Sequence, residues 1–281
     1  MFVGDSIQDV VAFLGWRDPT VAGGIQCEGT GFLLHYGGHG YLVTVRHVAD
    51  KFDRDPFVVR INRHRGKALL LDADNVQWYY PSDKLIDLAI TPADFGEPLY
   101  FPEKHIYSPR EHGTIGIGDI CYTAGLFHFI AGHTRNLPFL FTGHIALMPP
   151  PGEKIPVGNE AGGIDHVEGY LIENNAISGA SGSPVFVRPS YRSTGLRKDE
   201  PDSGLLMGQD QIALLGVYQA AWFLPPDAAR REAVKAKTSD VVPVGIGVVI
   251  PAQKLVDLLE IETLRQMRAK ALKPKIVSAK P

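Results

Sequence analysis

Three side-chain types that can together break an acyl bond occur in this sequence in the order His, Asp, Ser. Ser181 lies in the run "ISGASGSPVF", where small, conformationally permissive residues come directly before an apolar strand. A serine hydroxyl is a weak nucleophile until a base removes its proton, and in proteins that base is usually an imidazole. The run is therefore either a plain surface turn or a sharp bend around one activated hydroxyl.

The positions of the histidines limit the possible arrangements of catalytic groups. All ten precede the serine: His35, His39, His47, His64, His105, His112, His128, His133, His144 and His166. The α/β-hydrolases have the order Ser, acid, His, which this chain cannot follow, and the fifth position of their G-x-S-x-G motif is here Ser183. The histidines show no metal-binding spacing such as H-E-x-x-H, so we expect no metal. Acyl transfer by a serine and a histidine needs no cofactor, so none is expected.

His47 and Asp87 are the candidates for the base and the acid. His47 follows the apolar run "YLVTV", and Asp87 lies in "LIDLAIT", where the large apolar neighbours share the opposite face of a strand. A carboxylate among such neighbours is partly buried and requires a partner, for which a histidine N–H is suitable. Asp83 lies close by as a second candidate acid.

About a dozen short apolar segments separated by turn residues must position these groups. The 30 glycines and 21 prolines favour turns and short strands over long helices. In "GFLLHYGGHGYLVTV" the glycines stand where a hairpin requires positive φ. The pattern predicts an all-β barrel or sandwich. We expect strands at 31–36, 40–45, 56–61, 67–73, 76–80, 87–92, 119–127, 137–147, 169–174, 183–188, 211–220 and 244–250, and loops at 148–163, 188–204 and 224–240, the last with a short helix.

Both ends of the chain are expected to be helical. Asp5 is a suitable N-cap for an amphipathic helix that ends at Gly15. The C-terminal region has an apolar stripe at helical spacing, followed by a tail with six cations and one anion between Glu262 and Pro281. The tail is interpreted either as a solvated helix end, which the helix macrodipole favours, or as a docking site for a regulatory protein partner.

The composition is that of an ordinary globular protein, with 44% hydrophobic and 21% charged residues. A net charge of −3 gives no electrostatic reason to expect nucleic acid or an anionic membrane as a partner. No apolar run approaches the ~20 residues of a membrane-spanning helix, and the late first cation, Arg17, argues against a signal peptide. Two cysteines, Cys27 and Cys121, exclude a disulfide framework, and these features together favour a cytoplasmic location.

The segments "GTGFLLHYGGHGYLVTVRHVAD", "DLAI" and "GASGSPVF", in this order, resemble the trypsin-like (chymotrypsin-fold) serine peptidases, especially bacterial members without disulfides. The resemblance implies two six-stranded antiparallel β-barrels followed by a C-terminal helix. The expected domains are an N-terminal extension with a short helix, 1–24; a first barrel with His47 and Asp87, 25–130; a second barrel with Ser181, 131–255; and the C-terminal helix and basic tail, 256–281.

The resemblance also implies roles for these residues. In that family the serine before Gly-Ser-Pro is the nucleophile, which selects Ser181 over Ser178 and Ser183. His47 would take its proton, Asp87 would orient the imidazole, and the N–H groups of Gly179 and Ser181 would form the oxyanion hole. The predicted function is a serine endopeptidase that cleaves polypeptides through an acyl-enzyme.

By the same resemblance, the substrate pocket lies between the segment before the nucleophile and two strands. Its predicted residues are Asn175, Ala176, Val217, Tyr218, Gln219, Gly245 and Gly247. Asn175 falls where trypsin-like enzymes place their specificity acid, so we expect no preference for Lys or Arg. The pocket is expected either to be neutral and suited to small or medium apolar side chains, or to be filled and restricted by Tyr218.

Two positions depart from the family pattern. Ala180 stands where many members have an Asp that pairs with a newly released N-terminus, so we expect a chain that is made active. Val48 replaces the cysteine common in secreted relatives. Two other functions remain open: a catalytically silent protease-like scaffold that binds a partner, and an esterase that uses the same triad.

Overall fold

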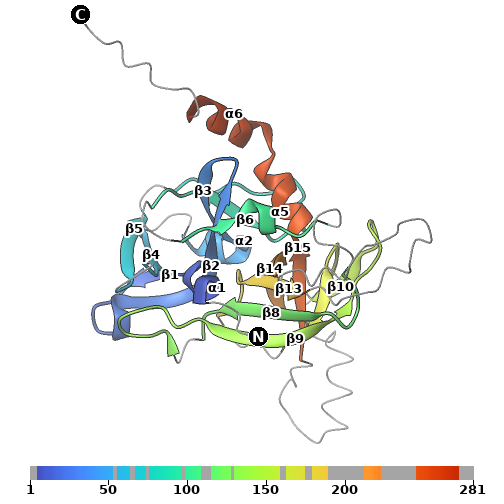
Figure 1. The fold of residues 1–281 in the computed structure, drawn as a ribbon, viewed down its shortest axis with the longest axis horizontal. Coiled ribbons are helices and arrows are strands. Elements are labelled where there is room, and N and C mark those ends of the chain that lie inside the picture. Colours follow the sequence, from blue (N-terminus) through green and yellow to red (C-terminus); the bar gives the residue numbers. More distant parts are fainter. Residues whose placement is uncertain are drawn as a thin grey trace, which may run out of the picture.

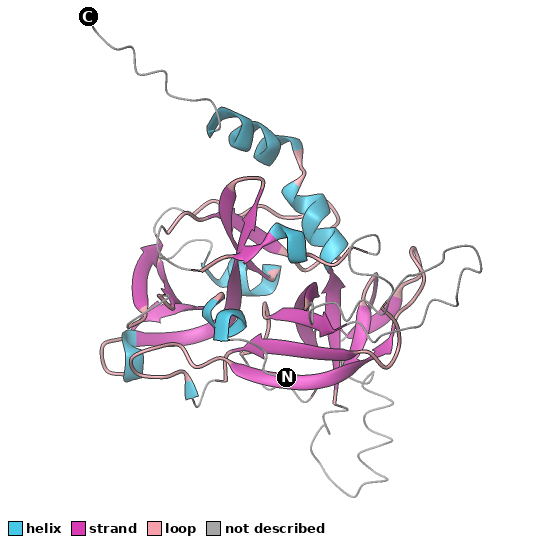
Figure 2. Ribbon diagram, viewed as in Figure 1, coloured by secondary structure: helices cyan, strands magenta, loops and turns pink. Residues whose placement is uncertain are grey.

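Two β-structures pack side by side in the computed structural model, and the helices of the C-terminal region lie outside them (Figure 1). The structure describes residues 5–52, 56–63, 67–73, 76–95, 99–108, 115–127, 130–158, 163–174, 179–188, 212–222 and 245–271. Strands dominate both halves, whereas the longer helices come at the C-terminal end (Figure 2). The predicted all-β class with two barrels and C-terminal helical structure is confirmed.

The first barrel is built on six antiparallel strands in the order β5-β4-β1-β2-β3-β6, and β7 pairs with β2 in parallel. Its strands are β1 Val11–Arg17, β2 Ile25–Tyr36, β3 His39–Thr44, β4 Phe57–Ile61, β5 Leu69–Ala73, β6 Ala89–Pro92 and β7 Phe101–Pro102. The predicted hairpin joins β2 to β3 through Gly37 and Gly38, whose φ angles are 55° and 82°. Two positive φ angles in a two-residue turn match the right-handed twist of the strands.

The N-terminal helix is shorter than predicted. Helix α1 covers only Asp5–Asp9, and the following residues form β1, which pairs with both β2 and β4. Residues 11–14 of β1 are fully buried. A strand covered on both faces is apolar along its whole length, so its sequence also fits the apolar face of a helix. The first barrel therefore begins at β1 and not at residue 25.

The second barrel is closed, with the strand order β12-β15-β14-β13-β8-β9. Its strands are β8 Ile120–Gly125, β9 Phe139–Leu147, β12 Tyr170–Glu173, β13 Pro184–Arg188, β14 Ala213–Ala221 and β15 Ile246–Pro251. We predicted β8 in the first barrel, but it pairs with β9 and β13. The second barrel therefore begins at β8 rather than at residue 131.

Some predicted segments differ from the structure. Segment 76–80 forms no strand and makes only an isolated bridge from Tyr79 to Ile90. The predicted loop 148–163 contains β10, Ile155–Gly158, which pairs with β11, Ile164–Val167. The predicted loop 188–204 beyond Arg188, and the loop 224–240 with its short helix, lie outside the described residues.

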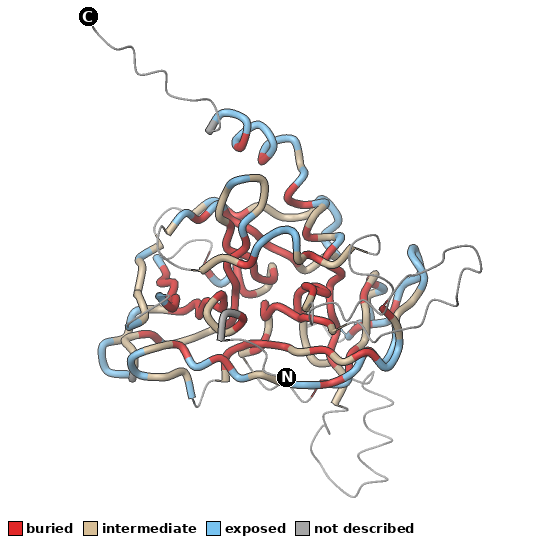
Figure 3. Tube along the Cα trace, in the orientation of Figure 1, coloured by how far each residue is buried: buried red, intermediate tan, exposed pale blue. Residues whose placement is uncertain are grey.

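The largest apolar core extends from the first barrel into the second (Figure 3). Side chains such as Phe186 and Leu214 of the second barrel belong to the same cluster as the interior of the first. A buried cation adds a polar connection, because Arg60 of β4 donates to the carbonyl groups of Gly132 and His133 at 2.9 Å each. Both carbonyls belong to the segment of chain that connects β8 to β9. Arg60 therefore links the first barrel directly to the second.

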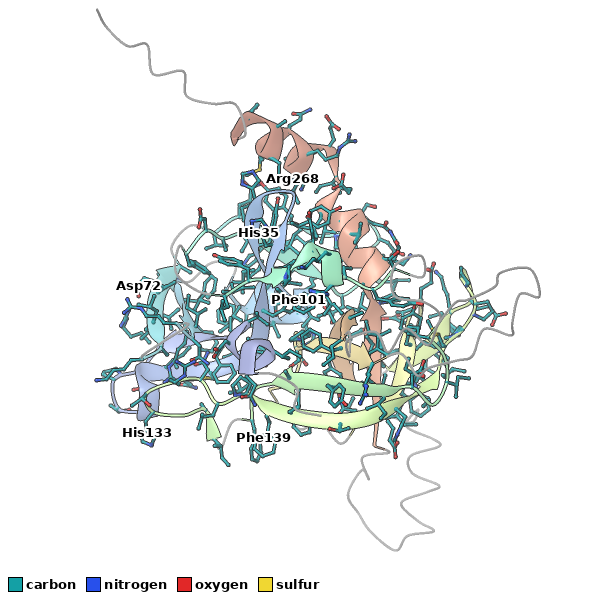
Figure 4. All side chains as sticks on the ribbon, in the orientation of Figure 1. His35, Asp72, Phe101, His133, Phe139 and Arg268 are labelled. Atoms are coloured by element: carbon teal, nitrogen blue, oxygen red, sulfur yellow. The ribbon has the colours of Figure 1, made fainter. Side chains whose placement is uncertain are left out.

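The C-terminal region forms two helices rather than the single one predicted. They are α5, Ala252–Leu259, and α6, Glu262–Ala271. Arg268 of α6 has a side chain only 10% exposed and donates to the Tyr41 hydroxyl at 3.2 Å, to the Leu259 carbonyl at 2.7 Å and to Glu260 at 2.9 Å. It lies where α6 meets the tip of the β2–β3 hairpin (Figure 4). This cation of the predicted basic tail thus anchors α6, and residues 272–281 lie outside the described part.

None of the helices in the described part has the length and apolar content that a bilayer crossing requires.

Candidate active site

The predicted base and acid lie in direct contact. His47 is part of α2, Arg46–Ala49, a short helix that follows β3, and its Nδ1 lies 2.7 Å from Oδ2 of Asp87. The backbone N–H of His47 donates to the other carboxylate oxygen of Asp87 at 2.9 Å. Because Asp87 binds both the ring and the backbone of one residue, the imidazole is held in one orientation, with Nε2 directed away from the carboxylate.

The burial of the two groups differs in a way that suits acid–base chemistry. The side chain of His47 is 36% exposed, whereas that of Asp87 is 17% exposed. The acid is thus largely shielded from water while the imidazole stays accessible to a substrate. The second candidate acid, Asp83, accepts a hydrogen bond from the N–H of Leu85 at 2.9 Å and so caps its own turn. The structure therefore brings Asp87, the predicted acid, to His47.

Two glycines with positive φ shape the turn that carries Ser181. The φ angle is 102° at Gly179 and 88° at Gly182, in a region that other residues avoid. The N–H of Ser183 donates to the carbonyl of Ala180 at 3.0 Å and closes the turn around the serine. The small residues from Gly179 to Ser183 therefore form a tight turn around Ser181.

Thr30 of β2 binds this turn to the first barrel. Its N–H donates to the carbonyl of Ser181 at 3.0 Å, and its hydroxyl donates to the carbonyl of Gly179 at 2.7 Å. The carbonyl of Thr30 accepts a hydrogen bond from the hydroxyl of Thr44 at 2.7 Å, and Thr44 comes three residues before His47. A short series of hydrogen bonds thus connects the turn of Ser181 to the strand end that precedes the base.

Close backbone packing brings the two halves of the site together. A Cβ on Gly182 would lie 2.0 Å from the carbonyl oxygen of Thr30 and 2.4 Å from Oγ1 of Thr44. On α2, Val48 packs so closely on Gly29 that a Cβ there would lie 2.7 Å from Cγ1 of the valine. The helix of His47 and the turn of Ser181 therefore pack on adjacent residues of β2, Gly29 and Thr30.

Sequence reasoning missed the part played by Thr30 and Thr44. Both residues are fully buried. Their hydroxyl groups therefore require internal hydrogen-bond partners. The only signal was a threonine within each apolar strand, "GTGFLL" and "YLVT". A threonine is common in strands for its branched shape alone, so this signal does not reveal a distant partner.

Replacing Thr30 by valine is expected to lower the free energy of unfolding by about 2 kcal/mol, because buried polar groups lose a partner. The hydroxyl of Thr30 also accepts the N–H of Leu126 at 2.9 Å, so two backbone groups are affected. Urea unfolding measures this loss. We expect the variant to react more slowly with a fluorophosphonate probe, since the turn of Ser181 is held less firmly. Thr30→Ser keeps the hydroxyl and is the matched control; equal labelling rates for the valine and serine variants would contradict this role.

The pocket candidates that the structure describes lie on or beside β14 and β15. They are Val217, Tyr218, Gln219, Gly245 and Gly247, whereas Asn175 and Ala176 lie outside the described residues. Adjacent side chains of a strand point to opposite faces, and here Val217 packs in the core that joins the barrels while Tyr218 packs in the interior of the second barrel. The carbonyl of Gly245 accepts the N–H of Asn174 at 2.8 Å, which places β15 beside the segment before the nucleophile.

Other reactive side chains form no comparable assembly in the described part of the chain. His144 pairs with Glu173 at 3.0 Å on the exposed surface, and the described residues contain no group of three or more His, Cys, Asp or Glu side chains that could hold a metal ion. Burial raises the pKa of the Cys27 thiol to about 11 and that of the Cys121 thiol to about 12. Both thiols are free, and at neutral pH they are protonated and unreactive. His64, His112 and His128 lie outside the described residues.

Comparison with known proteins establishes the class of fold. No family model and no curated protein matches the sequence. Among solved structures, the MamO protease domain from Magnetospirillum magneticum is similar, with a TM-score of 0.53 and 16% identity over 91% of this chain and 98% of that chain. The Rv3671c protease in its inactive form also aligns, with a TM-score of 0.49 and 16% identity over 91% of this chain and 89% of that chain. The first of these similarities, together with the two barrels, shows a chymotrypsin-like protease fold.

Proposed function

We propose that this chain is a serine endopeptidase that acts through a triad of His47, Asp87 and Ser181. The observation that carries the proposal is the double contact of Asp87 with the ring and the backbone of His47, beside the strand that binds the turn of Ser181. A carboxylate that fixes the orientation of an imidazole next to a serine is the arrangement that activates a serine hydroxyl.

The proposed reaction has two halves that use the same groups. First, Oγ of Ser181 attacks the carbonyl carbon of the substrate while Nε2 of His47 takes the hydroxyl proton. The C–N bond then breaks, and His47 returns the proton to the leaving amine. Next, His47 takes a proton from water, the oxygen of that water attacks the acyl ester, and the oxygen of Ser181 leaves and recovers its proton from His47. Asp87 holds the imidazole in place throughout and stabilises the imidazolium.

The backbone N–H groups of Gly179 and Ser181 are the proposed donors of the oxyanion hole. The positive φ of Gly179 and the two hydrogen bonds from Thr30 to the carbonyl groups of Gly179 and Ser181 support this role, since they hold the backbone that carries both donors. Losing one such donor typically costs about 2.7–4 kcal/mol of transition-state stabilisation. The rigidity of this turn is therefore as important to the proposed function as the triad.

A strand edge beside the turn, with which no further described strand pairs, supports a peptide as the substrate. β14 pairs with β13 as far as Val217, and beyond that point Ala220 and Ala221 pair with β15 alone among the described strands. An extended peptide can add to such an edge through main-chain hydrogen bonds. The N–H of Gly182 donates to the carbonyl of Tyr218 at 2.9 Å, so this edge starts next to the nucleophile. This favours an endopeptidase over an esterase that uses the same triad.

Intact-mass measurement after incubation with a fluorophosphonate probe tests the proposal. We expect the native chain to gain one probe adduct and Ser181→Ala to gain none, because only an activated serine displaces fluoride from the phosphorus. Ser183→Ala is the matched control, since Ser183 lies in the same turn but is fully buried, and it should react like the native chain. A native chain that is folded by circular dichroism and gains no adduct would contradict the proposal and favour a protease-like scaffold that binds a partner.

A further inference from the structure

Tyr218 is the residue of β14 that is bound most directly to the turn of the nucleophile. Its N–H donates to the carbonyl of Ser183 at 2.8 Å, and its carbonyl accepts the N–H of Gly182 at 2.9 Å. These two residues come directly after Ser181 in the sequence. The backbone of Tyr218 is therefore fixed next to the candidate nucleophile, and the position of its side chain follows from that of the turn.

The phenol ring of Tyr218 occupies the space between the turn, β14 and β15. Its residue exposure is only 2%, and it packs in the same apolar cluster as Ala180, which precedes Ser181. The ring lies directly over Gly247 of β15, where a Cβ would be 2.3 Å from Cε2 of the tyrosine. Gly247 and Ala180 are small residues, and they leave space for the large ring of Tyr218.

The hydroxyl of Tyr218 is unusual for a buried polar group. It is inaccessible to solvent and has no hydrogen-bond partner among the described residues. Burying a hydroxyl without a partner is unfavourable, and phenylalanine at the same position would avoid this cost. The hydroxyl thus makes no hydrogen bond within the described part of the chain, and it is the ring that fills the space beside the turn.

The position of this ring limits the substrate. For attack by Ser181, the scissile carbonyl must lie about 3 Å from the serine Oγ with its oxygen directed at the N–H groups of Gly179 and Ser181. The residue that supplies this carbonyl, here called the acyl residue, then has its side chain against the turn and the adjoining part of β14. In proteases of this fold, the pocket at that place selects the acyl residue by its size and charge.

We propose that Tyr218 determines specificity by filling this pocket, so that the chain cleaves peptides only after small acyl residues such as glycine, alanine or serine. The inference rests on the proposed function, because it concerns the substrate of the same site. The sequence left two kinds of pocket possible, an open apolar pocket and a pocket restricted by Tyr218. The position of the ring favours the restricted pocket.

Peptide substrates that differ only in the acyl residue test this inference. We expect the native chain to cleave the alanine substrate with a kcat/KM at least about 100-fold higher than that for the phenylalanine substrate. In Tyr218→Val, which opens the space over Gly247, the ratio of phenylalanine to alanine cleavage should rise about 10- to 100-fold. Tyr218→Phe keeps the ring and is the matched control, with an expected ratio within about twofold of the native one.

Fluorophosphonate labelling, measured in parallel, separates the two levels of the proposal. Normal labelling of Tyr218→Val with an unchanged substrate ratio would overturn the role of Tyr218 and leave the triad in place. A native preference for leucine or phenylalanine substrates would overturn it without any variant. If Tyr218→Val does not fold, Tyr218→Leu removes the ring at a smaller loss of volume, and the same comparison applies. Absence of labelling in the native chain would overturn the proposed function and this inference with it.

Discussion

Replacing Asp87 by asparagine is expected to lower kcat for peptide hydrolysis about ten-thousandfold at neutral pH. An amide nitrogen opposite Nδ1 of His47 would donate a proton there, where the carboxylate now accepts one across 2.7 Å. The ring proton would then sit on Nε2, and His47 could not take the proton of Ser181. The amide also removes the charge that stabilises the imidazolium. Steady-state kinetics with an alanine-type peptide substrate measures the loss.

Asp83→Asn is a matched control for this experiment, because Asp83 lies four residues earlier and caps its own turn. It should leave kcat within about twofold of the native value, as expected for a surface change away from the site. The backbone N–H of His47 can still donate to the amide oxygen of the Asp87 variant, so we expect circular dichroism and urea unfolding to show a folded protein. A loss of less than tenfold in the folded Asp87→Asn variant would contradict the proposed triad.

Replacing Gly182 by alanine is expected to lower the free energy of unfolding by about 3–5 kcal/mol, the sum of steric overlap and backbone strain. The new Cβ would lie 2.0 Å from the carbonyl oxygen of Thr30, which is backbone and cannot move aside alone. The φ of 88° at this position adds the cost of a left-handed conformation. Because the turn must leave β2 to relieve the overlap, we also expect fluorophosphonate labelling of Ser181 to be lost. Urea unfolding and intact mass measure both effects.

Gly152→Ala separates the two causes, since Gly152 has the same φ of 88° but no atom within 4 Å of an added Cβ. This control carries the backbone strain without the overlap and should cost about 1 kcal/mol. An equal loss of stability in both alanine variants would contradict this explanation. It would show that the contact with Thr30 is not the reason why residue 182 must be glycine. Undiminished labelling of Gly182→Ala would show that the nucleophile does not depend on this contact.

Much of the fold could be predicted from the sequence, because most strands are short apolar runs between turn residues. The glycine pair between β2 and β3 predicted a hairpin that the structure contains. β1 was missed because its buried residues, 11–15, follow a short helix and extend its apolar pattern. β8 was assigned to the wrong barrel, because it pairs with β9 and β13. Strand pairing depends on tertiary contacts, and these cannot be predicted from the composition of one strand.

The candidate site was partly predictable for a different physical reason. A carboxylate flanked by apolar residues must find a partner, and this requirement led to Asp87 and its contact with His47. The hydrogen bonds of Thr30 and Thr44 could not be predicted, because they join residues far apart in sequence and depend on the close approach of β2 to the turn at Gly182. The catalytic roles, the partner for the C-terminal tail and the cytoplasmic location stay predictions.

The two free thiols, one buried at Cys121 and one partly buried at Cys27, bear on how the chain would behave under changing redox conditions. Cys27 and Cys121 are free, and the raised pKa values of their thiols keep both in the protonated form that oxidants and alkylating agents attack slowly. Next to His47, Val48 packs on Gly29 by van der Waals contact rather than by a covalent bridge. The proposed nucleophile, Ser181, is a hydroxyl and not a thiol, so the proposed reaction does not involve a cysteine. We therefore expect the same activity in dithiothreitol, in oxidised glutathione and after treatment with iodoacetamide.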